Sequence, residues 1–128
     1  MPLSPSHLCN QIQPLLQDLS ELHALLGEDT VAPSPPDAAA VQRQVAQLQQ
    51  RFQQTLAAIA ETDLTPAVEQ RLRPHQTEAH RRLRLLGIEA MRLQAAKQVT
   101  TVERQRSQIQ AHTQALQQFI QAMADEIC

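Results

Sequence analysis

Apolar residues recur at alternating spacings of three and four along four stretches of the chain, and glycine or proline marks the first two boundaries between them. This spacing places the apolar residues on one face of an α-helix. The composition agrees, because 18 Ala, 17 Leu and 21 Gln favour helices while aromatic residues make up only 2% of the 128 residues. The chain is therefore predicted to be all-α, and a β-sandwich or barrel is excluded.

The first two stretches carry clear helix boundaries. Ser4 and Pro5 are typical of a helix start, Gly27 of a helix end, and Asp37 of the cap of a second helix. Pro14 should bend the first helix or delay its start. The proline-rich residues 28–36 predict an extended connection. The expected core positions are Leu8, Ile12, Leu15, Leu19, Leu22 and Leu26, then Val41, Val45, Leu48, Phe52, Leu56 and Ile59.

The last two stretches predict longer helices. Thr65 and Pro66 open the third, which we expect to be kinked at Pro74 or to begin with a short separate piece. Thr100 and Glu103 have the spacing of a capping box for the fourth. Short connections make neighbouring helices antiparallel. Residues 1–128 are thus predicted to form a single-domain antiparallel bundle of about four helices, the third of them long.

The third helix is apolar on two sides. Its main stripe includes Leu83, Leu86 and Leu93, whereas Leu85, Ile88 and Met91 point away from that stripe. Such a segment is either central in its own bundle or buried against a second subunit. We expect Leu85, Ile88 and Met91 to form the interface of a homodimer or higher oligomer.

The same helix carries most of the basic charge. Residues 1–66 have a net charge of −5, and residues 67–128 have a net charge of +3. A basic face that could bind an acidic protein segment is predicted from six arginines: Arg71, Arg73, Arg81, Arg82, Arg84 and Arg92. The alternative is a solvated face with local ion pairs such as Glu78 to Arg82. The overall charge of −2 and the lack of aromatic residues here disfavour nucleic-acid binding.

The sequence contains no recognisable catalytic motif. It contains no glycine-rich phosphate loop and no cysteine pair at metal spacing, and His75 and Glu78 reverse the order used in di-iron bundles without a second copy. We expect neither an enzyme nor a cofactor or metal site. The glutamines of the second helix predict a neutral solvent-facing surface, the alternative being a prion-like or partner-binding face.

The hydropathy of the chain and its first residues predict the compartment. No stretch is long and apolar enough to span a membrane, and the first residues lack the features of a signal peptide. We therefore expect a cytoplasmic protein. Cys9 and Cys128 lie near opposite ends of the sequence, and a reducing cytosol disfavours a disulfide between them.

Residues 73–97 form a distinctive block, and residues 76–98 read QTEAHRRLRLLGIEAMRLQAAKQ. This block is similar to the cyanobacterial heterocyst frequency control protein PatD family, most closely over about residues 70–106 and loosely elsewhere. The resemblance implies a small helical protein that acts in cell division at the division site. Its implied partner is the tubulin-like GTPase FtsZ, or another acidic division protein, and the family is linked to the frequency of heterocyst differentiation.

The resemblance implies no cofactor and supplies no catalytic residues. The expected function is therefore that of a non-enzymatic accessory protein that binds FtsZ and influences its assembly. Two alternatives stay open, a helical nucleic-acid-binding protein and an adaptor between other proteins. Salt-sensitive retention on DNA would support the first of these.

Overall fold

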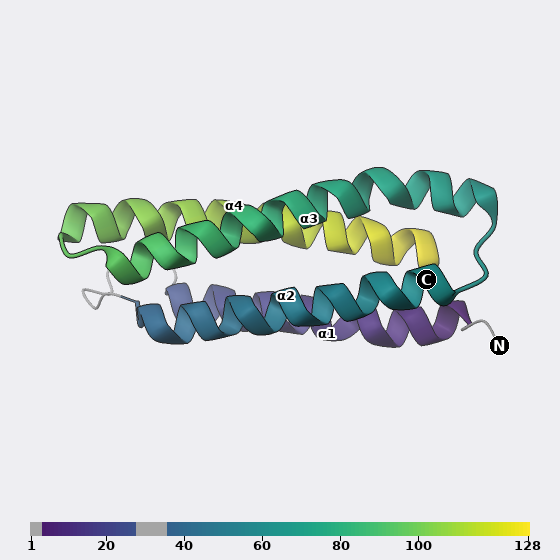
Figure 1. Ribbon diagram of the computed structural model, residues 1–128, viewed down its shortest axis with the longest axis horizontal. Helices are drawn as coiled ribbons and strands as arrows, with labels where there is room; N and C mark the ends of the chain where they lie inside the picture. The colour runs from purple at the N-terminus through teal and green to yellow at the C-terminus, as the bar shows by residue number, and fades with distance from the viewer. Residues whose placement is uncertain (1–3, 28–35) are drawn as a thin grey trace.

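The chain forms an antiparallel four-helix bundle, which confirms the predicted fold class. The computed structural model describes residues 4–27 and 36–128. Its helices are α1 (Pro5–Leu26), α2 (Ala38–Glu61), α3 (Pro66–Ala95) and α4 (Val99–Ile127). Figure 1 shows α1 and α2 in one layer and α3 and α4 in the other. The expected extended connection over residues 28–36 lies outside the described residues, apart from its last residue.

Helices that follow one another in the chain pack together, and α1 also packs against α4, which closes the bundle. The contact between α3 and α4 is the most extensive, and the contact between α2 and α3 is the smallest. The start of α1, the end of α4 and the connection between α2 and α3 lie at the same end of the bundle (Figure 1). Residues far apart in the sequence are thereby brought together at that end.

The core consists of the apolar stripes expected from the sequence. All six predicted positions of α1 are buried, as are Val41, Val45, Leu48 and Phe52 of α2. Leu56 and Ile59 pack against this core from its edge. In α4, Ile109, Leu116 and Met123 are buried, and these three residues follow one another at intervals of seven. Burial of a leucine-sized side chain contributes about 1.5–3 kcal/mol, so these stripes account for the stability of the arrangement.

Four predicted helix boundaries are confirmed and one is wrong. The first helix begins at Pro5 after Ser4, as expected. The side chains of Asp37 and Thr65 accept hydrogen bonds from the third residue beyond each, at 3.2 and 3.3 Å. Gly27 ends α1 with φ of 76°, a backbone conformation that glycine adopts without strain. The expected capping box of α4 does not form, because the helix begins at Val99 and the Glu103 carboxylate pairs with Arg106 instead.

Neither internal proline interrupts its helix. Pro14 lies inside α1 and Pro74 inside α3, and both helices continue through these positions. The delayed start of the first helix and the separate first piece of the third are therefore wrong. Figure 1 shows α3 as one continuous helix that crosses α4.

A disulfide joins Cys9 in α1 to Cys128 at the end of α4, with Cα atoms 5.9 Å apart. No disulfide was expected from the sequence, because a reducing cytosol disfavours one. That expectation is wrong, and it did not take the positions of the two cysteines in the fold into account. The hydrogen bond from Gln110 Nε2, near the middle of α4, to the Gly27 carbonyl oxygen at the other end of α1 is 3.1 Å long and fits the same antiparallel register. The disulfide is thus a consequence of how α1 and α4 align.

Candidate functional site

The six arginines predicted to form the basic face do not all point to one surface. Arg71 Nε donates a hydrogen bond of 2.6 Å to Glu126 Oε2 of α4. Arg82 Nη1 lies 3.3 Å from His112 Nδ1, also of α4. These two arginines therefore hold α3 against α4, and a partner protein would have to compete with those contacts.

Two further arginines pair with carboxylates of their own helix. Arg81 lies 3.6 Å from Glu78, and Arg92 lies 3.0 Å from Glu89. The local ion pair expected from the sequence, Glu78 to Arg82, is replaced by the pair of Glu78 with Arg81. Arg81 and Glu78 are both largely exposed, and a surface pair of this kind contributes at most about 1 kcal/mol. Glu89 is buried, so its pair with Arg92 lies at the edge of the core and lowers the positive charge of that arginine.

Arg73 and Arg84 differ from the other four. Both are exposed, and neither has a carboxylate partner among residues 4–27 and 36–128. Both line shallow cavities on the side of α3 that faces α2. One cavity, of about 320 Å³, includes Arg73, and the other, of about 310 Å³, includes Arg84.

We call the surface that contains these two cavities the α2–α3 seam. Its first cavity has an apolar floor formed by Leu56, Ile59 and Leu72, and its second adds Leu83. The ring of His80, which lines the second cavity, lies 6.4 Å from the ring of the buried Phe52. The remaining lining residues are Ala60, Glu69 and Gln76 in the first cavity and Gln49, Gln53 and His80 in the second.

Among the described residues, the seam has no polar link between its two helices. Within the described part of the chain, no side-chain hydrogen bond or ion pair joins α2 to α3, whereas each of the other three helix pairs has at least one such bond. Gly87 of α3 faces α2 closely, since a Cβ built on it would lie 2.6 Å from Gln49 Nε2. The space beside Gly87 is therefore occupied by the Gln49 side chain and not by the backbone of α2.

The second apolar side of α3 is at the surface. Ile88 is 41% exposed and Met91 is 62% exposed, while Leu85 is half-buried. Burial at the centre of this chain's own bundle, one of the two alternatives from the sequence, does not hold for Ile88 and Met91. The homodimer expected from these residues stays a prediction.

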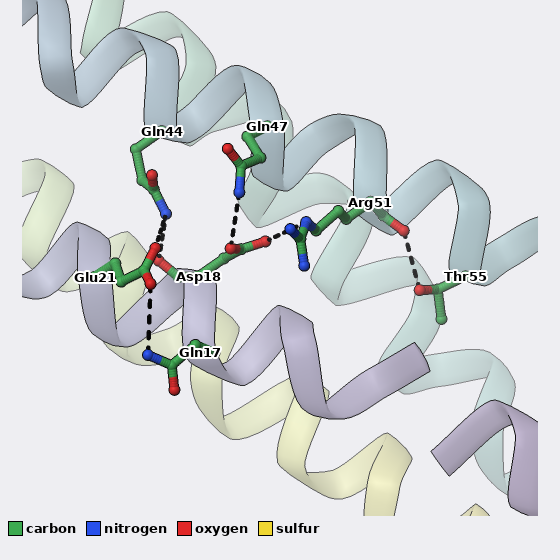
Figure 2. A network of polar contacts seen from close by, with 7 residues as sticks. All are labelled: Gln17, Asp18, Glu21, Gln44, Gln47, Arg51 and Thr55. Atoms are coloured by element: carbon green, nitrogen blue, oxygen red, sulfur yellow. Dashed lines mark hydrogen bonds and ion pairs between the residues drawn. The ribbon is translucent and has the colours of Figure 1, made fainter. Parts of the chain in front are cut away.

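A polar network links α1 to α2, and it centres on Asp18, which is 2% exposed (Figure 2). Gln47 Nε2 donates to Asp18 Oδ1 at 3.1 Å, and Arg51 Nε lies 3.2 Å from Asp18 Oδ2. Gln44 Nε2 bridges the Asp18 backbone carbonyl and Glu21 Oε2, at 3.1 and 3.2 Å. The glutamines of α2 are therefore not only the solvent surface expected from the sequence, because two of them bind α1.

Burial raises the pKa of Asp18 above its ordinary value, and the Arg51 charge and the Gln47 hydrogen bond oppose that rise in part. The sequence analysis missed this network, although a signal was present. Asp18 lies three residues after Leu15 and four before Leu22, so it occupies a position of the buried stripe. A carboxylate at that position requires polar partners on the facing helix.

A second polar group lies between α3 and α4, around His112. Burial lowers the pKa of His112 below its ordinary value, and the nearby Arg82 guanidinium lowers it further. Glu89, whose charge acts in the opposite direction, is itself buried on this side of α3. The arrangement favours a neutral imidazole that accepts a hydrogen bond from Arg82.

The remaining expected features can be placed as follows. His75 is half-buried and His80 is exposed. In the ranges that the structure describes, no group of three or more His, Cys, Asp and Glu side chains is placed to hold a metal ion. Likewise, none of the described helices is long and apolar enough to cross a membrane.

Comparisons with protein-family models, with curated proteins and with solved structures gave no match. The similarity of residues 73–97 to the PatD family therefore stays a prediction from the sequence.

Proposed function

We propose that this chain is a non-enzymatic accessory protein of cell division that binds an acidic segment of FtsZ through α3 and influences FtsZ assembly. The proposal takes the identity of the partner from the resemblance of residues 73–97 to the PatD family. It takes the binding surface from the arginines of α3. The proposed place of action is the cytoplasm, at the division site.

One observation carries the proposal, namely that exposed arginines concentrate on a single helix of a bundle whose overall charge is slightly negative. Arg71, Arg73, Arg81, Arg84 and Arg92 are all exposed. Arginine binds carboxylates in a planar, bidentate geometry, so this helix suits an acidic protein segment. Contacts of exposed charges mainly accelerate association and weaken as salt is added.

The test is the binding of the full chain to purified FtsZ, measured by biolayer interferometry at low and at high salt, together with sedimentation of FtsZ polymers. The test variant replaces Arg81, Arg82 and Arg84 by Glu. We expect a loss of affinity of about tenfold or more, since each reversed charge removes an attraction and adds a repulsion.

The matched control replaces three exposed cations outside the proposed surface, Arg43, Lys97 and Arg104, by Glu, which changes the net charge by the same amount. Circular dichroism checks that both variants keep their helices. Equal binding of the test variant and the unmodified chain would contradict the role of α3. Absence of any binding to FtsZ, or of any change in its polymers, would contradict the proposed partner.

A second candidate function, self-association, is favoured by the exposure of Ile88 and Met91. A homodimer that uses Leu85, Ile88 and Met91 would remove these side chains from water. Sedimentation velocity at micromolar concentration tests it, with Ile88→Gln and Met91→Gln combined as the variant. A chain that is monomeric at all concentrations would contradict the homodimer.

A further inference from the structure

We propose that the α2–α3 seam is a docking groove for an amphipathic acidic helix of the partner, with Arg73 and Arg84 binding two carboxylates of that helix. This inference rests on the proposed function, since it specifies which surface of α3 the acidic partner uses and what secondary structure the partner adopts there. Three features of the seam support it: the spacing of the two arginines, the apolar residues that line the cavities and the charges along the seam.

The spacing of the arginines fits a helical partner. Arg73 and Arg84 are eleven residues apart on one helix, which corresponds to about 16 Å and to three turns. They therefore share one side of α3, the side whose cavities face α2. A partner helix lying along the seam would present carboxylates at the same separation if its acidic residues were also eleven apart, and both would then meet a guanidinium.

The floor of the seam suits the apolar side of such a helix. Leu56, Ile59 and Leu72 line the cavity beside Arg73, and Leu83 lines the cavity beside Arg84. The contact between α2 and α3 is also the smallest of the four helix contacts. Helices that lay an apolar stripe in a groove between two other helices are a common mode of peptide recognition.

Charge decides between an acidic partner and a second copy of this chain. If two copies met seam to seam in antiparallel order, Arg73 of each copy would face Arg84 of the other, and the like charges would repel. The carboxylate that lines the seam is Glu69, one turn before Arg73, and it does not form an ion pair with a described residue. The seam thus has a net positive charge that a negatively charged helix complements.

The experiment measures binding of the full chain to a fluorescent helical peptide that carries a leucine stripe and two glutamates eleven residues apart. A matched peptide has glutamine at those two positions. We expect the glutamate peptide to bind at least about tenfold more tightly, and this preference to be lost when Arg73 and Arg84 are both replaced by Glu. The control chain carries Arg43→Glu and Arg104→Glu, an equal change in charge at exposed arginines outside α3, and should keep the preference.

Each outcome either supports or overturns the groove. Equal affinities for the two peptides, or equal losses in the seam variant and the control variant, would overturn it, because a general basic surface would explain both results. Measuring the same variants against FtsZ separates the two proposals. If the peptide binds the seam and FtsZ does not bind, the proposed partner is wrong and the groove stands. If FtsZ binds the seam variant as tightly as the unmodified chain, the groove is wrong while the proposed function stands.

Discussion

Reduction of the disulfide between Cys9 and Cys128 should destabilise the bundle substantially. The bond closes a loop with a sequence separation of 119 residues, so it restricts nearly the whole unfolded chain. Chain-entropy arithmetic for a loop of this size gives about 5 kcal/mol, whereas measured effects of disulfides more often lie at about 2–4 kcal/mol. We expect the free energy of unfolding to fall by about 2–4 kcal/mol, which lowers the Tm by roughly 10 °C in a chain of this length.

The measurement is thermal and urea unfolding followed by circular dichroism, with and without a reductant. A variant with both Cys9→Ser and Cys128→Ser controls for other effects of the reductant, and its unfolding should resemble that of the reduced chain under both conditions. The reasoning would be refuted if the native, unreduced chain reacted with a thiol reagent at both cysteines. It would equally be refuted if reduction left the Tm unchanged.

Three further predictions concern single positions in the bundle. Gly87→Ala should stabilise α3 by about 0.5–1 kcal/mol, because the added methyl group displaces only the flexible end of Gln49, and urea unfolding tests this. Arg51→Ala should destabilise the bundle by about 1–2 kcal/mol, since it leaves the buried Asp18 carboxylate without its cation, and Asp18→Asn combined with it should recover part of the loss. The pH dependence of unfolding should have two opposite contributions. Because the pKa of His112 is lowered in the folded chain, its contribution to the free energy of unfolding should be greatest above about pH 6.5 and should decrease as the pH falls below that value. His112→Gln should remove this decrease. Because the pKa of Asp18 is raised in the folded chain, its contribution to the free energy of unfolding should be greatest below pH 3.8 and should decrease as the pH rises. Asp18→Asn should remove this pH dependence.

The helices and their core could be predicted because a single repeating pattern determines both. The spacing of apolar residues gave the buried face of each helix, and Asp37, Thr65 and Gly27 gave three of the boundaries. The errors have physical reasons. Thr100 and Glu103 match the capping pattern, but Glu103 has a nearby arginine that competes for its carboxylate. The prolines lie where the core packing of a long helix outweighs the loss of one backbone hydrogen bond.

Contacts between helices could be predicted less well than the helices themselves. The pairing of Cys9 with Cys128 depends on the antiparallel register of α1 and α4, which the sequence pattern of either helix alone does not contain. The division of the α3 arginines has the same origin. Arg71 and Arg82 differ from Arg73 and Arg84 only in which neighbouring helix they face, α4 or α2. A periodic pattern gives the direction of a side chain from its own helix, but not the identity of its neighbour.

The distribution of links around the bundle indicates where a partner could bind with least disruption. The Asp18 network joins α1 to α2, the disulfide joins α1 to α4, and Arg71 and Arg82 join α3 to α4. The α2–α3 seam has apolar contacts and the Phe52–His80 ring contact, without a polar link among the described residues. A helix docked on this seam would displace no hydrogen bond or ion pair between helices, whereas a partner on the α4 side of α3 would compete with Arg71 and Arg82 for their present acceptors. The same arginine-rich helix is therefore better suited to bind a partner on the side of α2 than on the side of α4.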